Sequence, residues 1–254
     1  MTERIALVTG ASSGIGAATA RALAHDGAAV ALLARREDRL HELASDIERT
    51  CGAETHVLPV DVTDHEAVEA AVSEVVEVFG GLDVLVNNAG ILRMSDDLVD
   101  LSIEDYRTQM AVNCDGMFYA TRAALPHLRE SRGTVVFVGS DSAKHADPVL
   151  ATYGATKWWT RGFAKNLEAR EGRNGIGVVL VNPGDTRTEI EFRGERLVDA
   201  YDPDDMLAPE DVAHVVAFAA RQDGRVNLGE IDVSERSLYS DIYRGLTEDE
   251  AETR

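Results

Sequence analysis

The stretch Arg4-Ile-Ala-Leu-Val-Thr-Gly-Ala-Ser-Ser-Gly-Ile-Gly16 decides the fold of this chain. Residues 4–9 are an apolar run of strand length, three glycines follow within seven residues, and residues 17–25 have the composition of a helix that ends before Gly27. A buried strand, a glycine turn and a helix in this order predict the first unit of a parallel α/β sheet.

The glycine turn itself suggests a ligand. Gly10, Gly14 and Gly16 lack the Cβ atoms that would keep a pyrophosphate away from the backbone, and the next helix supplies N–H donors and the positive end of its dipole. The spacing is G-x-x-x-G-x-G, which differs from the common G-x-G-x-x-G. Glycine turns often bind nothing, but the position between strand and helix favours a dinucleotide site. Its expected residues here are Gly10, Ser12, Ser13, Gly14, Ile15 and Gly16.

The rest of the chain repeats the alternation of strand and helix. Further strands are expected at 28–34, 55–60, 82–86, 134–138, 177–181 and 230–233, with helices between them. This order predicts a single-domain, doubly wound Rossmann fold, with a mostly parallel seven-stranded sheet and helices on both faces. The domain should span residues 1–246. Residues 189–208 lack periodicity and are expected to form a substrate lid, and the acidic tail 247–254 is expected to be disordered.

Composition restricts the partners. The chain of 254 residues carries 25 basic and 45 acidic residues, a net charge of -20. Such an acidic surface repels phosphate backbones, so nucleic-acid binding is not expected. No apolar run approaches the roughly 18 residues of a membrane span, which predicts no membrane segment and a cytoplasmic location. The two Cys and seven His show no metal-binding spacing, so no metal is expected. The acidity fits a salt-adapted organism, or an ordinary acidic enzyme with Arg favoured over Lys.

One helical pair has the spacing for proton transfer. Tyr153 and Lys157 stand at i and i+4 and therefore share a helix face. An ammonium about 4 Å from the phenol would stabilise the phenolate by roughly 4 kcal/mol. This would lower the pKa of Tyr153 from about 10 by about three units and make it a usable acid or base. A hydroxyl such as that of Ser140 could then hold the reacting oxygen. The alternative is an ordinary helix with a solvated lysine.

Two arginines distinguish between cofactors. Arg35 and Arg36 follow the second strand, and Arg35 lies 19 positions after Gly16. An acidic residue in this region would bind the ribose 2'-hydroxyl of NAD, whereas Arg accommodates the 2'-phosphate of NADP. NADP is therefore favoured over NAD, the alternative being solvated charges on the first turn of a helix. Asp61 and Val62, at the end of the third strand, are placed to border the adenine.

Other candidate contacts lie at the carboxyl ends of later strands. The small and amide residues of Asn87-Asn-Ala-Gly90 are expected to line the cofactor cleft, or else to form a polar turn. The loop after the fifth strand could form a wall of a substrate pocket. Its candidate contacts are Asp141, Ser142, His145, Val149 and Leu150, with His145 better explained as a solvated loop residue.

Taken together, these motifs resemble the short-chain dehydrogenase/reductase family over essentially the whole chain. The matching stretches are Thr9-Gly-Ala-Ser-Ser-Gly-Ile-Gly16, Asp61-Val62, Asn87-Asn-Ala-Gly90, Asn113, Ser140, Tyr153-x-x-x-Lys157 and Pro183-Gly-x-x-x-Thr188. The resemblance implies a catalytic tetrad of Asn113, Ser140, Tyr153 and Lys157, and subunits that pair as a homodimer or homotetramer. It also implies that Pro183, Gly184, Thr186 and Thr188 hold the nicotinamide, next to Asn88, Ala89 and Gly90.

Two features bear on the branch of the family. Asp185 stands where an apolar residue is more usual. The segments Ala34-Arg-Arg-Glu-Asp-Arg-Leu40 and Val226-Asn-Leu-Gly-Glu-Ile231 are similar to the NADP-dependent branch that acts on 3-hydroxy acids such as serine.

The implied activity is the interconversion of a carbonyl and a secondary alcohol or hydroxy acid by hydride transfer with NADP(H). In that mechanism Tyr153 is the acid/base, and Ser140, Ser142 and Tyr153 contact the substrate. Lys157 contacts the ribose, and Asn113 anchors a water that returns the proton through Lys157. The alternatives are a non-catalytic cofactor-binding sensor or scaffold on the same fold, and, among enzymes, an epimerase or dehydratase.

Overall fold

The computed structural model describes residues 4–236 apart from 96, 148, 193–194, 197–198, 200–205 and 223. Its strands are β1 (Ile5–Thr9), β2 (Ala29–Ala34), β3 (Thr55–Pro59), β4 (Val84–Asn87), β5 (Thr134–Val138), β6 (Gly177–Pro183), β7 (Glu191–Phe192), β8 (Glu195–Arg196) and β9 (Gly229–Val233). Its α-helices are α1 (Gly14–His25), α2 (Glu37–Cys51), α3 (His65–Phe79), α4 (Ile103–Met110), α5 (Met117–Ser131), α6 (Ala151–Glu171) and α8 (Pro209–Ala220). Short helical turns are η1 (Leu98–Asp100), η2 (Ala111–Gly116), η3 (Asp141–Ala143) and η4 (Gly172–Asn174).

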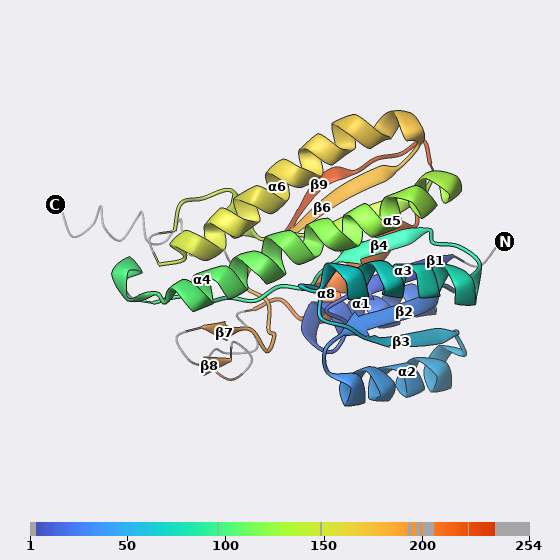
Figure 1. The fold of residues 1–254 in the computed structure, drawn as a ribbon, viewed down its shortest axis with the longest axis horizontal. Coiled ribbons are helices and arrows are strands. Elements are labelled where there is room, and N and C mark those ends of the chain that lie inside the picture. Colours follow the sequence, from blue (N-terminus) through green and yellow to red (C-terminus); the bar gives the residue numbers. More distant parts are fainter. Residues whose placement is uncertain are drawn as a thin grey trace.

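Seven strands form one parallel sheet in the order β3-β2-β1-β4-β5-β6-β9 (Figure 1). Residues of the central strands are buried almost without interruption, as expected for a sheet that is covered on both faces. The predicted doubly wound Rossmann fold with a seven-stranded sheet is confirmed.

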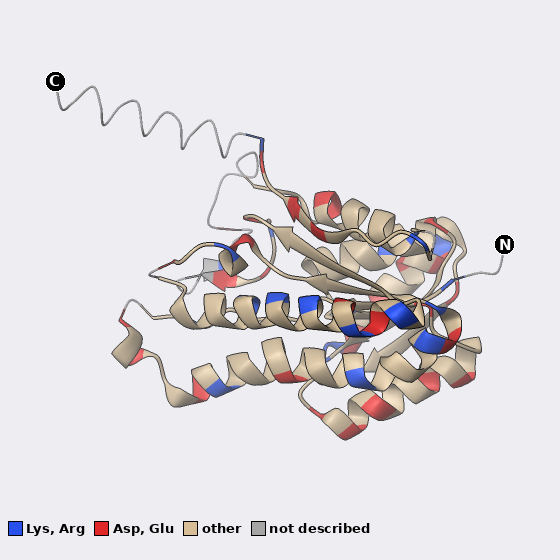
Figure 2. Ribbon diagram, turned by 90° about the horizontal axis from the view of Figure 1, so that it is seen from above, with Lys and Arg blue, Asp and Glu red and all other residues tan. Residues whose placement is uncertain are grey.

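The helices form a layer on each face of the sheet (Figure 1). Helices α1, α2 and α8 bury their apolar residues against one face, and α3, α5 and α6 against the other. In Figure 2 the positions of Lys, Arg, Asp and Glu lie mainly on the helices and loops, whereas most of the strands have none. The apolar strands therefore hold the core, and the excess of carboxylates lies on the outer layers.

The strand order places a crevice at one edge of the sheet. The chain runs outward from β1 through β2 to β3, and then returns to β4 on the other side of β1. The loops after β1 and β4 consequently turn to opposite faces, which opens a space beyond the carboxyl ends of these two strands. The glycine turn and Asn87-Asn-Ala-Gly90 both lie at this position.

The helical segment around Asn113 is irregular. Between α4 and α5 the chain forms the π-helical turn η2, which contains Asn113. Single π turns inside helices are often found at functional positions. The register of the helix therefore changes at Asn113.

The segment after β6 differs in detail from the expected lid. Within residues 189–208, β7 and β8 form a small antiparallel pair, and Thr186 forms an isolated bridge with Leu207. Positions 193–194, 197–198 and 200–205 of this segment, and the tail 247–254, lie outside the described residues. Within the described part of the chain, no helix has the length and apolar character needed to cross a membrane.

Candidate active site

A cavity of about 580 Å³ follows the carboxyl edge of the sheet. It extends from Arg35 and Arg36, past the glycine turn, to Tyr153 and the segment after β6. Most of the predicted cofactor and substrate residues line it, including Ser140, Tyr153 and Lys157 of the predicted tetrad, but Gly16 and Asn87 do not. Asp141 and Leu150 are also among its walls, whereas His145 and Val149 are not.

The glycine turn leaves space that other residues would fill. Gly10 and Gly14 have φ values of +66° and +52°, which side chains rarely permit. A Cβ on Gly10 would lie 2.8 Å from Cα of Ala89, and a Cβ on Gly16 would lie 2.3 Å from the carbonyl oxygen of Gly10. Gly16 thus keeps α1 close to the turn from behind the cavity, and the cradle fits a pyrophosphate at the start of α1.

The amide of Asn88 secures this cradle. Its Nδ2 donates to the carbonyl oxygens of Thr9 and Gly10, at 2.9 and 3.2 Å. The hydroxyl of Thr9 accepts hydrogen bonds from the backbone N–H groups of Asn88 and Ala89 and donates to the carbonyl of Val86. The loops after β1 and β4 are therefore joined by hydrogen bonds. Asn88 was predicted to line the cavity, and in the structure it also holds the glycine turn.

At the far end of the cavity, Arg36 connects the glycine turn to the segment after β6. Its guanidinium donates to the hydroxyls of Ser12 and Ser13 and to Oε2 of Glu189, the last at 2.8 Å. Arg35 lies 3.7 Å from the carboxylate of Asp61. Both arginines line the cavity, although the side chain of Arg35 is 68% exposed to solvent.

The predicted catalytic pair is buried. Tyr153 and Lys157 are 9% and 6% exposed, and Nζ of Lys157 lies 5.5 Å from the centre of the Tyr153 ring. Nζ donates to the carbonyl oxygen of Val138, at 3.1 Å. Ser140 ends β5 beside them, where its hydroxyl donates to Asp141 and accepts from the N–H of Ser142.

The predicted lowering of the pKa of Tyr153 is wrong for the protein alone. Burial raises the pKa of Tyr153 to about 12, a hydrogen bond with Ser140 acts in the opposite direction, and Asp141 and Asp185 add to the increase. Burial also lowers the pKa of Lys157 to about 8. Spacing indicated that the two side chains meet, but it gave no measure of the desolvation that both undergo.

Asn113 connects two segments of the site through hydrogen bonds and lies outside the cavity. Its Oδ1 accepts from the N–H of Ile91, at 2.8 Å, and its Nδ2 donates to the carbonyl oxygen of Ile91 and to the hydroxyl of Thr156. The residue is 2% exposed and does not line the cavity. The side chain of Asn113 consequently holds the loop after β4 against α6, which also carries Tyr153 and Lys157.

Carboxylates gather at the substrate end. Asp141, Asp147 and Asp185 line the cavity near Tyr153. Burial raises the pKa of Asp185, and Asp141 and Asp147 raise it further. Burial likewise raises the pKa of Glu235, with contributions from Asp185 and Asp141. Among the described residues, no three His, Cys, Asp or Glu side chains are arranged to hold a metal ion.

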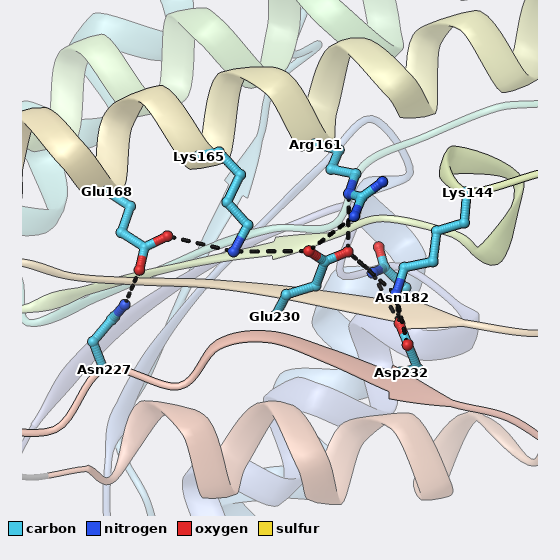
Figure 3. A network of polar contacts seen from close by, with 8 residues as sticks. All are labelled: Lys144, Arg161, Lys165, Glu168, Asn182, Asn227, Glu230 and Asp232. Carbon is cyan, nitrogen blue, oxygen red and sulfur yellow. Dashed lines mark hydrogen bonds and ion pairs between the residues drawn. The ribbon is translucent and has the colours of Figure 1, made fainter.

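Sequence reasoning missed a polar network that anchors the walls of the site (Figure 3). Lys144, just beyond Ser140, pairs with Asp232 at 2.6 Å and with Glu230 at 3.3 Å, both on β9. Asn182, which precedes the Pro183-Gly184 turn, donates to the same two carboxylates. The network is completed by Arg161, Lys165, Glu168 and Asn227. The basic residues come at helical spacing on α6, but the sequence gave no indication that β9 would face them.

The fold and the cavity together define a Rossmann-type protein with a dinucleotide cradle at one end and a buried Tyr–Lys pair at the other. The family model of the short chain dehydrogenases matches residues 4–195. The chain belongs to this family and is an oxidoreductase of its type.

Individual relatives agree with this assignment. An uncharacterized oxidoreductase of Staphylococcus haemolyticus is 35% identical, over 92% of this chain and 99% of its own. Two solved structures have the same fold: an alcohol dehydrogenase from the archaeon Thermococcus sibiricus complexed with 5-hydroxy-NADP, and a 3-ketoacyl-(acyl-carrier-protein) reductase from Brucella melitensis complexed with NADH. Their TM-scores are 0.83 and 0.82, their identities 31% and 30%, and each comparison covers 91% of this chain and 96% of the other.

Proposed function

We propose that this protein is an NADP(H)-dependent dehydrogenase/reductase that interconverts a carbonyl group and a secondary alcohol. The observation that carries the proposal is the convergence of Tyr153, Lys157 and Ser140 at one end of a cavity whose other end is the glycine cradle. A nicotinamide dinucleotide, when bound, supplies or accepts the hydride.

Each predicted catalytic residue has a role in this proposal. Tyr153 is protonated at neutral pH, because burial raises its pKa to about 12, and it donates that proton to a carbonyl oxygen during reduction. Ser140 positions the oxygen beside it. Lys157 holds its charge next to the ring and contacts a ribose, and Asn113 anchors a water that returns the proton.

The direction of the reaction should affect its pH dependence. Oxidation of an alcohol requires Tyr153 to accept a proton, and only its ionised form can do so. Because the pKa of Tyr153 is raised, the rate of oxidation should increase with pH, whereas reduction should proceed at neutral pH.

The preference for NADP over NAD is supported by the position of two arginines. Arg35 and Arg36 line the cavity beyond the glycine turn, and Arg36 donates to the hydroxyls of Ser12 and Ser13. A 2'-phosphate would find guanidinium and hydroxyl donors there. Asp61 and Val62 border the adenine in this proposal. The nicotinamide end is held by Asn88, Ala89, Gly90, Pro183, Gly184, Thr186 and Thr188.

The charge of the substrate end restricts the substrate. Asp141, Asp147 and Asp185 lie near Tyr153, and a substrate carboxylate would be repelled by them. A neutral carbonyl compound therefore suits the site better than a 3-hydroxy acid, although both belong to the proposed reaction class. Ser142 is a proposed substrate contact beside Ser140.

The test is Tyr153→Phe. This substitution removes the proton donor but keeps the ring, so we expect turnover to fall by about 10³-fold with NADPH binding within about twofold of wild type. The rate is followed at the absorbance of reduced nicotinamide with a panel of aldehydes, ketones and alcohols, and binding by calorimetry. Tyr119→Phe is a matched control, because Tyr119 on α5 does not line the cavity and its ring contacts His65. Substantial residual turnover of Tyr153→Phe would refute the role.

The remaining proposals concern the setting of the enzyme. We place it in the cytoplasm, as a homodimer or homotetramer whose subunits pair through the long helices. Exposed apolar residues on α4, α5 and α6 support such pairing: Ile103, Tyr106, Phe118 and Trp158. We keep residues 1–246 as the proposed domain, with the described residues 189–191 of the expected lid segment on the cavity wall. Sedimentation of wild type, and of Trp158→Glu, tests the assembly.

A further inference from the structure

The carboxylate of Glu189 lies at the end of the cavity where Arg36 would bind a 2'-phosphate. Glu189 follows Thr188 in the segment after β6, yet its carboxylate reaches across to α2 and its preceding loop. Oε2 lies 2.8 Å from Nη1 of Arg36, and Oε1 lies 3.7 Å from Nη1 of Arg39. The hydrogen bond from Arg36 lowers the pKa of Glu189, so this carboxylate is charged at neutral pH.

The guanidinium that holds Glu189 has other partners at the glycine turn. Arg36 donates through Nη2 to Ser13, at 2.7 Å, and to Ser12, at 3.0 Å. Nη1 of Arg36 donates to the carboxylate of Glu189. An anion that binds between the serines and Arg36 must therefore share the guanidinium with Glu189 or displace its carboxylate.

The pairing also positions the backbone next to it. Thr188 packs on the glycine turn, since a Cβ on Gly14 would lie 3.1 Å from Cγ2 of Thr188. Glu189, the next residue, is bound to Arg36 above the same turn. The Glu189–Arg36 pair thus lies at the end of the cavity that the ribose phosphate of a dinucleotide would enter.

We propose that Glu189 is a specificity-determining residue: its carboxylate competes with the 2'-phosphate of NADP for Arg36 and Arg39. This inference rests on the proposed function. A phosphate carries more charge than a carboxylate and three acceptor oxygens, so it can take over the guanidinium. Because Glu189 must first be displaced, the binding free energy that NADP gains from its 2'-phosphate is smaller. NAD has no 2'-phosphate and leaves the Glu189–Arg36 pair intact, so its binding free energy is not reduced in this way.

The experiment uses fragments that carry the phosphate but no nicotinamide. Binding of adenosine 2',5'-bisphosphate and of 5'-AMP is measured by calorimetry for wild type, Glu189→Gln and Glu191→Gln, at low salt. Glu191→Gln is the matched control, because it removes a carboxylate from the same segment that pairs with Arg93, at 3.6 Å, instead of Arg36.

We expect Glu189→Gln to bind the bisphosphate about fivefold more tightly than wild type, which is the size expected for loss of an exposed ion pair. Its affinity for 5'-AMP should change by less than about twofold, and Glu191→Gln should alter neither. In an Arg36→Gln background, Glu189→Gln should no longer strengthen binding of the bisphosphate, because the guanidinium for which both anions compete is gone. Higher salt should reduce the fivefold gain.

Three outcomes overturn the inference. If Glu189→Gln and Glu191→Gln strengthen binding of the bisphosphate equally, the cause is the loss of one negative charge near the cavity and not competition for Arg36. If Glu189→Gln weakens binding of 5'-AMP or of NAD, Glu189 binds ribose hydroxyls instead of competing with phosphate. If wild type binds neither the bisphosphate nor NADP, the inference and the proposed function both fail. Binding of NADP without turnover of any carbonyl substrate contradicts the proposed function alone and leaves the competition measurable.

Discussion

The two ends of the cavity each contain a positively charged side chain, but one is paired with a carboxylate and the other is buried without one among the described residues. Arg36 is 44% exposed at the cofactor end and pairs with Glu189 and two serine hydroxyls. Lys157 is 6% exposed at the catalytic end, and the described residues offer it the carbonyl oxygen of Val138 but no carboxylate. Pairing satisfies the first charge, whereas burial opposes the second and lowers its pKa to about 8.

This difference indicates what each charge is for. An exposed ion pair is worth little and can be exchanged for a ligand. A buried ammonium without a countercharge destabilises the folded protein, and such a residue persists where its charge has a use. Lys157 should therefore matter for turnover and cost stability, and Arg36 should matter for binding at little cost.

The largest effect is expected from Lys157→Met. The variant keeps the length of the side chain and removes the charge, so turnover should fall by about 10³-fold. Its free energy of unfolding at neutral pH should rise by about 1–2 kcal/mol, because an unpaired buried charge is removed while Val138 loses one hydrogen bond. Steady-state kinetics and urea denaturation measure the two. Lys165→Met on the same helix is the control, since Lys165 is 42% exposed and paired with Glu168.

The pH dependence of the free energy of unfolding tests whether the effect comes from the charge of Lys157. Burial lowers the pKa of Lys157 from its usual 10.5 to about 8, so the unfolded chain binds more protons than the folded protein between these values. The stability of wild type should therefore approach that of Lys157→Met as the pH rises from about 8 to 10.5. If the difference in stability between the two proteins does not change with pH, or if Lys157→Met is less stable than wild type at neutral pH, the buried charge of Lys157 does not destabilise the protein.

Asn113→Ala should have the next largest effect. It removes hydrogen bonds to both backbone groups of Ile91 and to Thr156, and leaves buried polar groups unpaired. We expect a loss of about 2–3 kcal/mol in the free energy of unfolding, measured with urea. Asn166→Ala is the control, because Asn166 is exposed and bonds only the carbonyl of Gly162 among the described groups, so its loss should stay within about 0.5 kcal/mol. Equal losses in the two variants would exclude a special role for the π turn.

Glu171→Gln tests a buried charge that does have a partner. The side chain of Glu171 is 1% exposed, and its carboxylate accepts from Nε and Nη2 of Arg129, at 2.9 and 2.7 Å. We expect a loss of about 1–2 kcal/mol at pH 7, less than for a fully buried pair because Arg129 is 43% exposed. Glu69→Gln is the control, since its pair with Arg122 is exposed on both sides.

The effect of Glu171 has a defined pH window. Arg129 lowers the pKa of Glu171 from its usual 4.5 to about 2. A carboxyl whose pKa is lowered by folding stabilises the protein above its unfolded value, and this contribution disappears as the pH falls from about 4.5 toward 2. The difference between wild type and Glu171→Gln should shrink over that range. If acid unfolding of the two proteins differs by the same amount at pH 3 and pH 7, the ion pair is not the cause.

Salt should have the smallest effect per charge. The chain has a net charge of -20. In the part of the chain that the structure describes, acidic residues lie mainly on the outer helices and loops, where multimolar KCl screens repulsion between carboxylates. If the acidity reflects a salt-adapted organism, the melting temperature should rise by several degrees between 0.1 and 2 M KCl. A melting temperature that stays the same or falls would favour the alternative, an ordinary acidic enzyme. Glu189→Gln should show a similar rise, since one of many exposed carboxylates is lost.

Local patterns in the sequence predicted much of the site. The apolar strand runs and the glycine turn led to the sheet and its cradle, since each depends on neighbouring residues. The i, i+4 spacing placed Tyr153 and Lys157 on one helix face for the same reason. By contrast, the contact of Lys144 with Asp232 joins residues 88 positions apart, and no short pattern encodes it.

What the sequence determined by itself is the order of strands and helices, the glycine cradle and the identity of the residues around it, because backbone sterics and side-chain periodicity act over a few residues. Tertiary structure alone decided how charged those residues are and what they touch. Burial raised the pKa of Tyr153 instead of lowering it, and chain folding brought Glu189 onto Arg36, since desolvation and ion pairing depend on segments that meet only in the folded protein.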